Sequence, residues 1–371
     1  MKIVVVAGAR PNFVKVAPIL EALREAGHDG FLVHTGQHYD PGMSDAFFRD
    51  LGIQEPDVHL GVGSASHASQ TARIMEAFAP VLERVVPDWV VVVGDVNSTL
   101  ACALVTAQLR PSIGCRLAHV EAGLRSGDWS MPEEANRVLT DRLSDLLLLP
   151  SEDATSNLLA EGLDPRRMIF VGNVMIDSLL RMLPSARTLD MPARLGLRHR
   201  PYAVVTLHRP SNVDEPKRLR VIVEALAELS RQVAVLFPAH PRTRQRLAAF
   251  TLDSAMSDVR IIEPLGYLEM LSLQESASVV LTDSGGVQEE TTVLGVPCVT
   301  IRETTERPVT VTEGTNRLVA WPPTKSGIVA TARASIMMGR VEVGVKAPRG
   351  WDGLASERIV EELGRAPARA R

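Results

Sequence analysis

The stretch Leu281-Thr-Asp-Ser-Gly-Gly-Val-Gln-Glu-Glu290 contains an apolar run that ends at a glycine turn, after which a helical pattern begins. This order predicts a strand, a tight turn and the start of a helix. Ser284, Gly285 and Gly286 would place backbone N–H groups and a hydroxyl at the positive end of a helix dipole, which suits a phosphate. Glu290 is interpreted as an acceptor for a ribose hydroxyl. The alternative is an ordinary capped helix whose glutamates only complement the dipole.

The length and charge of the chain predict a soluble protein of two domains. A chain of 371 residues exceeds the roughly 250 to 300 residues at which one hydrophobic core stops growing. A net charge of −4 creates no broad field for nucleic acid or anionic lipid, so neither kind of partner is expected. The apolar start of the chain is too short for a signal sequence, and no later stretch reaches the length of a membrane span. We expect an unprocessed cytoplasmic protein.

The cysteines also predict a cytoplasmic protein. Cys102, Cys115 and Cys298 form no CxxC pair and no metal-ligand spacing. This pattern indicates neither a disulfide framework nor a zinc site, and it fits a reducing cytoplasm.

Apolar runs rich in β-branched residues alternate with amphipathic stretches along the chain. Such runs predict strands that are covered on both faces, and therefore parallel sheets. The stretch Leu183–Pro201 contains three prolines and several arginines, and residues 183–200 are predicted as a linker. The predicted strands are Ile3–Ala7, Phe31–Thr35, Trp89–Gly94, Arg116–Val120, Leu146–Pro150 and Ile169–Val171 before the linker, and Ala203–Thr206, Val233–Pro238, Val259–Ile262, Val279–Thr282, Val299–Ile301 and Leu318–Val319 after it.

Two doubly wound α/β domains follow from this pattern, over residues 1–182 and 201–353. Ligands of such sheets bind outside the carboxyl ends of the strands. The cleft between the two domains is therefore the expected site.

Two cations follow the first predicted strand, in Gly8-Ala-Arg-Pro-Asn-Phe-Val-Lys15. Arg10 and Lys15 would lie at the carboxyl end of a strand near a helix start, where they suit an anionic ligand. They could equally be solvated surface charges. The loop is not GxGxxG, so the dinucleotide fingerprint is absent.

Carboxylates follow the next strands of the same sheet. Asp95 comes directly after four valines, and Glu121 follows the neighbouring strand. Glu133 and Glu134 occupy the first turn of a helix that Pro132 initiates. Like charges at one sheet edge are the pattern in which a pKa is raised for proton transfer. Asp95 could instead cap a helix, and Glu134 could serve only the helix dipole.

Further polar residues lie at predicted strand ends. Gln37 follows the second strand, and Arg73 lies on a helix predicted from Ser66 to Val85. His208 and His240 end two adjacent strands of the second domain. A lone histidine is usually structural, but two of them facing the Ser284 turn are harder to dismiss.

Five motifs of this chain resemble those of the non-hydrolysing UDP-N-acetylglucosamine 2-epimerases. They occur in the same order and at similar spacing, and the resemblance extends from the first strand to about Val319. Several long motifs together are a specific signal. The motifs are Gly8-Ala-Arg-Pro-Asn-Phe-Val-Lys15, His119-Val-Glu-Ala-Gly-Leu-Arg125, Pro132-Glu-Glu-Ala-Asn-Arg137, Asp283-Ser-Gly-Gly-Val-Gln-Glu-Glu290 and Thr304-Thr-Glu-Arg-Pro308.

The resemblance implies a glycosyltransferase-B-like α/β fold, in which two Rossmann-like doubly wound domains have the active site between them. It also implies a C-terminal helix, within residues 354–371, that packs back on the first domain. The family inverts C2 of UDP-N-acetylglucosamine to give UDP-N-acetylmannosamine. The reaction eliminates UDP to leave a 2-acetamidoglucal and then adds UDP back. The resemblance implies a homodimer and no metal or nicotinamide cofactor.

Site residues carry over motif by motif. Catalytic roles are implied for Asp95, Glu121, Glu133 and His208. UDP-binding roles are implied for Arg10, Lys15, His208, Ser284, Gly285, Gly286, Glu290 and Arg307. In some bacterial members a second substrate molecule binds as an activator, and the matching positions here are Gln37, Arg73, Arg209 and His240.

The chain also departs from the family pattern. The first motif usually has glutamate where this chain has Asn12, and the loop between Arg125 and Pro132 is two residues shorter. Asn12 and the segment Gln37-His-Tyr-Asp40 resemble members that act on other UDP-2-acetamido sugars, including diacetamido uronic acids. Leu207-His-Arg-Pro-Ser211 replaces the usual second-domain motif, which leaves activator binding open. A UDP-sugar glycosyltransferase of the same fold and a non-catalytic UDP-sugar sensor are the alternatives to an epimerase.

Overall fold

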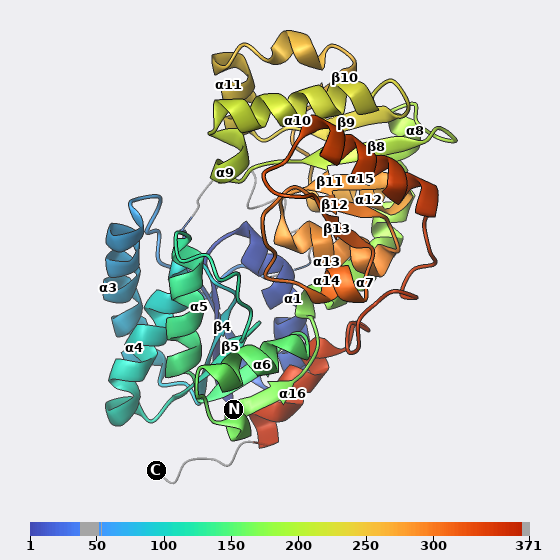
Figure 1. Cartoon of the computed structure of the whole chain (residues 1–371). Coiled ribbons are helices and arrows are strands. Elements are labelled where there is room, and N and C mark those ends of the chain that lie inside the picture. Colours follow the sequence, from blue (N-terminus) through green and yellow to red (C-terminus); the bar gives the residue numbers. More distant parts are fainter. Residues whose placement is uncertain (38–51, 53, 366–371) are drawn as a thin grey trace. The chain divides into compact units, whose positions relative to one another are not determined.

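A computed structural model describes residues 1–37, 52 and 54–365 of the chain. The chain divides into two compact units (Figure 1). The first contains Met1–Ser178 and the residues from Arg349 on, and the second contains Leu179–Pro348. Each unit is built around one parallel sheet.

The sheet of the first unit has the strand order β3-β2-β1-β4-β5-β6-β7, and all its pairs are parallel. The order reverses direction between β1 and β4, which makes this the topological switch point of a doubly wound sheet. The two-residue strand β3 was not predicted, because so short a run carries no periodicity. The strands are β1 (Lys2–Ala7), β2 (Asp29–His34), β3 (Val58–His59), β4 (Trp89–Val93), β5 (Arg116–Val120), β6 (Leu146–Leu149) and β7 (Met168–Phe170).

The central strands of this sheet are buried on both faces. Val4 of β1 pairs with Phe31 of β2 on one side and with Val90 of β4 on the other. Val90 itself is 0% exposed. The continuous valine run is therefore covered by helices on both sides, as its sequence predicted.

The helices of the first unit follow its strands in alternation. α16 packs against α1, and the indole of Trp89 donates a hydrogen bond to the carbonyl of Leu363, 3.2 Å away. The C-terminal segment that follows the second unit therefore packs on the first unit through α16. The helices are α1 (Arg10–Glu25), α3 (His67–Val85), α4 (Asn97–Ile113), α5 (Pro132–Leu143), α6 (Asp153–Ala160), the 3-10 turn η1 (Pro165–Arg167) and α16 (Ala355–Arg365). α7 (Val174–Leu189) begins in the first unit and continues into the second.

The sheet of the second unit has the order β10-β9-β8-β11-β12-β13, again entirely parallel. This order is that of a Rossmann sheet, with the switch point between β8 and β11. The predicted strands of this half match the observed ones to within two residues. They are β8 (Tyr202–Thr206), β9 (Ala234–Pro238), β10 (Val259–Ile262), β11 (Val279–Thr282), β12 (Cys298–Thr300) and β13 (Asn316–Leu318).

One core cluster fills the second unit. It joins inward-facing residues of β8, β9 and β11, such as Val205, Val235 and Leu281, to the buried faces of α10 and α15. The helices are α8 (Met191–Arg194), α9 (Pro210–Val213), α10 (Pro216–Leu229), α11 (Pro241–Ala249), the 3-10 turn η2 (Asp253–Met256), α12 (Tyr267–Ser276), α13 (Gly285–Leu294), α14 (Val309–Thr312) and α15 (Lys325–Met338).

Residues 183–200, predicted as a linker, are helical over more than half of their length. α7 runs through Pro184 to Leu189, and α8 follows from Met191. Leu179, Leu183 and Ala186 recur at helical spacing and are buried, so packing outweighs the local cost of the proline. The prediction was wrong because it weighted the prolines above this apolar periodicity.

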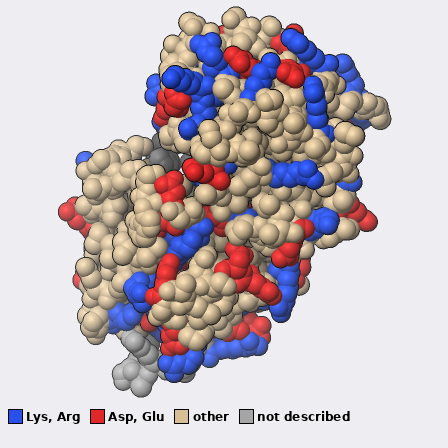
Figure 2. All heavy atoms as spheres, viewed as in Figure 1, with Lys and Arg blue, Asp and Glu red and all other residues tan. Residues whose placement is uncertain are grey.

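Charged side chains of both signs are interspersed over the face that Figure 2 shows. Among the described residues, no helix has both the length and the apolar character needed to cross a bilayer.

Candidate functional site

The switch point of the first unit brings together the loops after β1, β4 and β5. Gly94 follows β4 with φ of +69°, a conformation that favours glycine, and its N–H donates to the carbonyl of Val120, 3.0 Å away. The loop after β4 is therefore fastened to the end of β5. Asp95 and Glu121, the two residues predicted at these strand ends, lie on the fastened loops.

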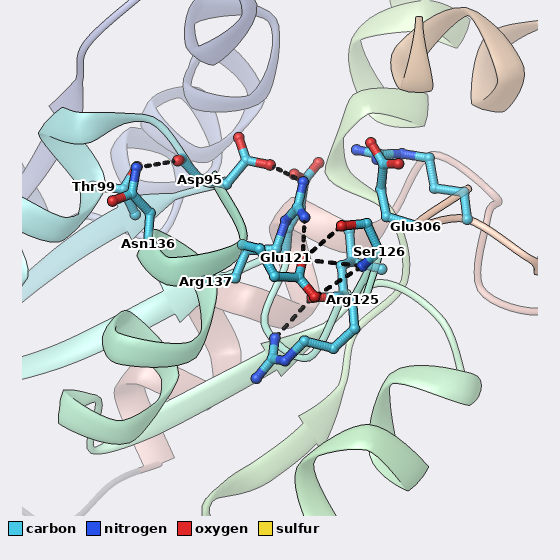
Figure 3. A network of polar contacts seen from close by, with 12 residues as sticks. Asp95, Thr99, Glu121, Arg125, Ser126, Asn136, Arg137 and Glu306 are labelled. Atoms are coloured by element: carbon cyan, nitrogen blue, oxygen red, sulfur yellow. Dashed lines mark hydrogen bonds and ion pairs between the residues drawn. The ribbon is translucent and has the colours of Figure 1, made fainter. Parts of the chain in front are cut away.

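Asp95 is held through its backbone and its side chain (Figure 3). Its carboxylate forms an ion pair with Arg137 of α5, and its backbone carbonyl accepts a 2.8 Å hydrogen bond from Asn136. The Arg137 side chain is 4% exposed, whereas that of Asp95 is 28% exposed. The carboxylate therefore has a fixed orientation and remains accessible to a ligand. The alternative of a mere helix cap is not supported, because Asp95 pairs with a different helix from the one it precedes.

Glu121 is the most constrained of the predicted carboxylates. Its φ of +68° lies in the left-handed region, which costs a residue other than glycine about 1 to 2 kcal/mol. Its Oε2 lies 2.5 Å from Nζ of Lys15, and the two side chains are 3% and 8% exposed. Its Oε1 is buried and accepts no hydrogen bond from any described residue. One carboxylate oxygen is thus paired with a cation, and the other keeps its full capacity to accept a hydrogen bond or a proton.

Asn12 and Gly8, at the start of the first motif, have structural roles. The amide oxygen of Asn12 accepts from the backbone N–H groups of Gly8 and Ala9, at 3.1 and 3.0 Å, and its amide nitrogen donates to Val93. A Cβ on Gly8 would lie 2.3 Å from Oγ of Ser98, so this glycine allows α4 to approach β1. Asn12 thus fastens the loop after β1 instead of presenting its amide to a ligand.

Glu133 and Glu134 are adjacent but have different surroundings. Glu134 is 2% exposed, accepts hydrogen bonds from the backbone of Ser126 and Gly127, and pairs with Arg137 at 2.7 Å. Burial raises the pKa of Glu134, but these donors outweigh it and hold the pKa below its usual value. Glu134 therefore fixes the loop before α5, which is more than dipole compensation. Glu133 is half-buried and makes no hydrogen bond or ion pair with any residue that the structure describes.

The switch point of the second unit is organised by Asp283, at the end of β11. Its buried carboxylate accepts from the backbone N–H groups of His208 and Arg209, and from the side chain of Asn212 at 3.1 Å. Nδ1 of His208 lies 3.0 Å from Oδ1 of Asp283. Burial raises the pKa of Asp283, and these partners more than offset it, so the carboxylate stays ionised. His208 is thereby oriented while its side chain remains 51% exposed to a ligand.

The glycine turn at the start of α13 leaves its N-terminus open to a ligand. Ser284 occupies the N-cap position, but its hydroxyl makes no capping hydrogen bond within the described part of the chain. A Cβ on Gly285 would lie 2.7 Å from Nη1 of Arg307, so glycine allows this guanidinium to approach the helix start. Gly286 is partly exposed. With Asp283 bonded to the His208 loop, the side chains do not support the alternative of an ordinary capped helix.

A cluster of guanidinium groups surrounds this turn. Glu306 is 3% exposed and contacts Arg302 at 2.7 Å, Arg307 at 2.9 Å and Arg209 at 3.3 Å. Burial raises the pKa of Glu306, and the arginines outweigh it and lower that pKa far below its usual value. Arg307 also pairs with Glu289 at 2.7 Å. Three guanidinium groups thus converge beside the glycine turn, and such groups suit an anion.

Glu290 lies behind the turn and is 5% exposed. Burial, and then the nearby charge of Glu289, raise the pKa of Glu290 to about 7, against hydrogen bonds from Gln274 and Tyr267. This carboxyl group therefore titrates near neutral pH, and when it is ionised both of its oxygens are acceptors with no competing O–H donor.

The four predicted activator positions lie two in each unit. Gln37 is 6% exposed, and its side-chain oxygen accepts from the N–H and hydroxyl of Ser98 at 3.1 and 2.8 Å. Arg73 is exposed on α3. Arg209 contacts Glu306, and His240 is the N-cap of α11, where its Nδ1 accepts from the backbone of Arg242. An activator site at these positions stays a prediction.

The sequence analysis missed several residues of the site. Arg302 was not assigned a role from the sequence, although its Nη1 is buried and has no hydrogen-bond partner among the described residues. His119 and Asp141 were not singled out, although they form a buried pair. A histidine inside an otherwise apolar strand was the signal for the first of them. The side chain of Arg10, at the start of α1, lies outside the described part of the structure, as does His38.

The described residues contain no group of three or more His, Cys, Asp or Glu side chains that could hold a metal ion. The polar groups gathered at the two switch points are instead suited to an anion and to proton transfer. Carboxylates predominate at the first and guanidinium groups at the second.

Comparisons with known proteins agree with the five sequence motifs. A family model described as UDP-N-acetylglucosamine 2-epimerase matches residues 21–364. A relative of that name from Methanocaldococcus jannaschii is 41% identical over 376 residues, with 98% of this chain and 99% of the relative covered. A relative from Pseudomonas aeruginosa, named UDP-2,3-diacetamido-2,3-dideoxy-D-glucuronate 2-epimerase, is 42% identical over 341 residues, with 91% and 92% covered.

A solved structure gives the same result for the fold. The crystal structure of the Methanocaldococcus jannaschii UDP-GlcNAc 2-epimerase, in complex with UDP-GlcNAc and UDP, matches with a TM-score of 0.88 at 40% identity. The match covers 98% of this chain and 99% of that one. The predicted α/β class, with two Rossmann-like units of glycosyltransferase-B type, is confirmed. The chain belongs to the UDP-N-acetylglucosamine 2-epimerase family.

Proposed function

We propose that this protein interconverts UDP-N-acetylglucosamine and UDP-N-acetylmannosamine by inverting C2 of the sugar. The observation that carries the proposal is the pair of carboxylates at the first switch point, each fixed by a cation: Asp95 by Arg137 and Glu121 by Lys15. A binding module or a simple UDP-sugar transferase has no need of two oriented carboxylates there. A UDP-GlcNAc 2-epimerase 40% identical to this chain has been solved with UDP-GlcNAc and UDP bound, which supports the same substrate class.

The proposed reaction has two stages. A carboxylate takes the proton from C2, the C2–H electrons form the C1–C2 double bond, and the C1–O bond breaks with its electron pair leaving on UDP. The 2-acetamidoglucal then accepts UDP at C1 while a proton is delivered to the opposite face of C2. Asp95, Glu121 and Glu133 are the proposed proton-transfer groups, and positioned groups of this kind contribute about 100- to 10,000-fold to a rate.

The second unit is proposed to bind UDP. The open N-terminus of α13 and the three guanidinium groups around Arg307 suit the diphosphate. The carboxylate of Glu290 is proposed as the ribose acceptor, and His208 as a contact to the nucleotide near the leaving oxygen. Charge on the departing UDP would be stabilised there as the C1–O bond breaks.

A second substrate is favoured by one specific observation. The relative named for a diacetamido uronate is as similar to this chain, at 42% identity, as the relatives named for UDP-N-acetylglucosamine. A uronate would add a carboxylate at C5 of the sugar. Parallel assays with the two UDP-sugars at equal concentration separate the substrates by their kcat/KM.

The reaction is tested by incubating UDP-N-acetylglucosamine with the protein in D2O. Epimerisation through a glycal must give product deuterated at C2, with traces of free UDP and glycal, and NMR detects both. Product that keeps protium at C2 would contradict elimination. Tight binding without any exchange, for both UDP-sugars, would identify a sensor.

Two further expectations rest on the family resemblance. We expect a homodimer, which light scattering of the purified protein measures. We also expect a cytoplasmic protein, because the three cysteines are buried and none forms a disulfide within the described part of the chain, as suits a reducing compartment.

A further inference from the structure

A buried histidine joins the two loops that carry the proposed catalytic carboxylates. His119 of β5 is 0% exposed. Its Nδ1 lies 2.6 Å from Oδ1 of Asp141 on α5, and its Nε2 lies 2.8 Å from the carbonyl oxygen of Gly94. Both distances are those of good hydrogen bonds.

Both partners of the ring are acceptors. A backbone carbonyl cannot donate, and Asp141 also accepts from the backbone N–H of Gly123 at 3.1 Å and from Arg125 at 2.8 Å. The backbone N–H of Gly123 and the guanidinium of Arg125 both meet Oδ2 of Asp141, so this partner is a carboxylate. Each ring nitrogen must therefore carry a proton to satisfy its neighbour.

Arg125 extends this cluster towards the surface. It pairs with the buried Asp141 at 2.8 Å and with Glu161 at 2.7 Å, and the Glu161 side chain is 29% exposed.

We propose that His119 is a positioning residue that donates from both ring nitrogens and so fixes the loop carrying Asp95. The imidazolium donates to Gly94, whose left-handed backbone sets the direction of Asp95, while Asp141 binds the turn at Gly123 that follows Glu121. One charged pair thus sets the spacing of both strand-end loops. The His119–Asp141 pair is fully buried under these loops and does not touch the substrate. This inference rests on the proposed function for its catalytic consequence, but not for the protonation state of the ring.

The protonation state is measured by NMR on protein labelled with 15N-histidine. The chain has nine histidines, and comparison with the His119→Gln spectrum assigns the ring of interest. At pH 8 we expect both nitrogens of His119 to give imidazolium signals with attached protons. A neutral ring, with one nitrogen unprotonated at pH 8, would overturn the proposal whatever the enzyme's activity.

Two matched variants separate the two contacts. His119→Gln places an amide N–H where Nε2 donates to Gly94, and His119→Asn places one where Nδ1 donates to Asp141. Loss of the Gly94 contact should displace Asp95, and a displacement of about 1 Å costs roughly 100-fold. We therefore expect kcat to fall about 100-fold in His119→Asn and distinctly less in His119→Gln, with KM changed little in either.

The partly exposed His28 provides the control, as His28→Asn. Circular dichroism and thermal unfolding verify that each variant is folded. If both His119 variants fold and lose activity equally, the proposed Gly94 tether is wrong. If the wild-type protein epimerises no UDP-sugar, the proposed function fails, and the NMR result still decides the state of His119.

Discussion

The two sheets share one topology, but their switch points carry opposite chemistry. At the first, Asp95 and Glu121 each pair with a cation. The Asp95 side chain is partly exposed, and one oxygen of Glu121 accepts no hydrogen bond from the described residues. At the second, three guanidinium groups surround a glycine turn whose helix N-terminus is open. The strand order decides where a ligand can bind. The local charge balance decides whether that edge transfers protons or holds an anion.

The comparison predicts its largest effect at Glu121. Glu121→Gln keeps the shape of the side chain but removes its ability to take a proton. We expect kcat for epimerisation to fall about 100- to 10,000-fold, while calorimetry gives an affinity for UDP close to that of the wild type. Glu25→Gln, at an exposed position of the same unit, is the control. A loss of less than tenfold would remove Glu121 from the proton transfer.

The second switch point should lose stability as the pH rises. Burial raises the pKa of Glu290 from 4.5 to about 7, so the folded state binds the proton more tightly than the unfolded state. The contribution of this group is full below pH 4.5 and is lost between pH 4.5 and about 7. The loss amounts to about 3 kcal/mol. Urea unfolding at pH 5 and pH 8 measures it, and Glu290→Gln should abolish this part of the slope.

Glu290 should also link pH to ligand binding, because its ionised form accepts ribose hydroxyls best. The affinity for UDP should rise through about pH 7 in the wild type more than in Glu290→Gln. The difference between the two proteins removes the titration of UDP itself. Identical pH profiles would mean that the carboxylate of Glu290 is not a nucleotide contact.

The first unit should show the opposite trend. Burial, and then the neighbouring His59, lower the pKa of His34 from 6.5 to about 4. Its contribution to stability is therefore full above pH 6.5 and is lost as the pH falls to about 4. The loss is again about 3 kcal/mol at most. His34→Phe, which keeps a ring against Phe13, should flatten the acid side of the unfolding profile, and an unchanged acid slope would contradict this assignment.

A smaller effect is expected at Arg307. Arg307→Lys keeps the positive charge beside Glu289 and Glu306, but it cannot reproduce the planar fork of the guanidinium. We expect UDP binding to weaken by about 1.5 to 3 kcal/mol, as measured by calorimetry. The matched substitution Arg333→Lys, on the exposed face of α15, should leave the affinity unchanged. Equal affinities in both variants would move the diphosphate away from the glycine turn.

The smallest effect is predicted at Asn12, whose side chain forms hydrogen bonds with the backbone of Gly8, Ala9 and Val93. Asn12→Ala should lower the free energy of unfolding by about 1 kcal/mol, as the loss of a helix cap does. The ratio of kcat/KM between UDP-N-acetylglucosamine and a diacetamido uronate should stay the same. A changed ratio would show that this position selects the sugar, as its departure from the family pattern had suggested.

The sequence predicted the strands well because a buried parallel strand is a local signal. The valine run at β4 and the apolar run before the glycine turn need no knowledge of distant residues. Residues 183–200 were misjudged for the reverse reason. Their prolines are visible in the sequence, whereas the packing of Leu183 and Ala186 that keeps α7 helical comes from the folded unit.

The sequence by itself determined that carboxylates, arginines and a glycine turn end particular strands, because strand ends and turns are set by neighbouring residues. The tertiary structure alone decided how those groups are paired. Lys15 reaches Glu121 across 106 positions of the chain, and Glu134 is bonded to a loop while the adjacent Glu133 is not. Pairing, burial and the resulting charge states depend on which elements pack together, so no local pattern determines them.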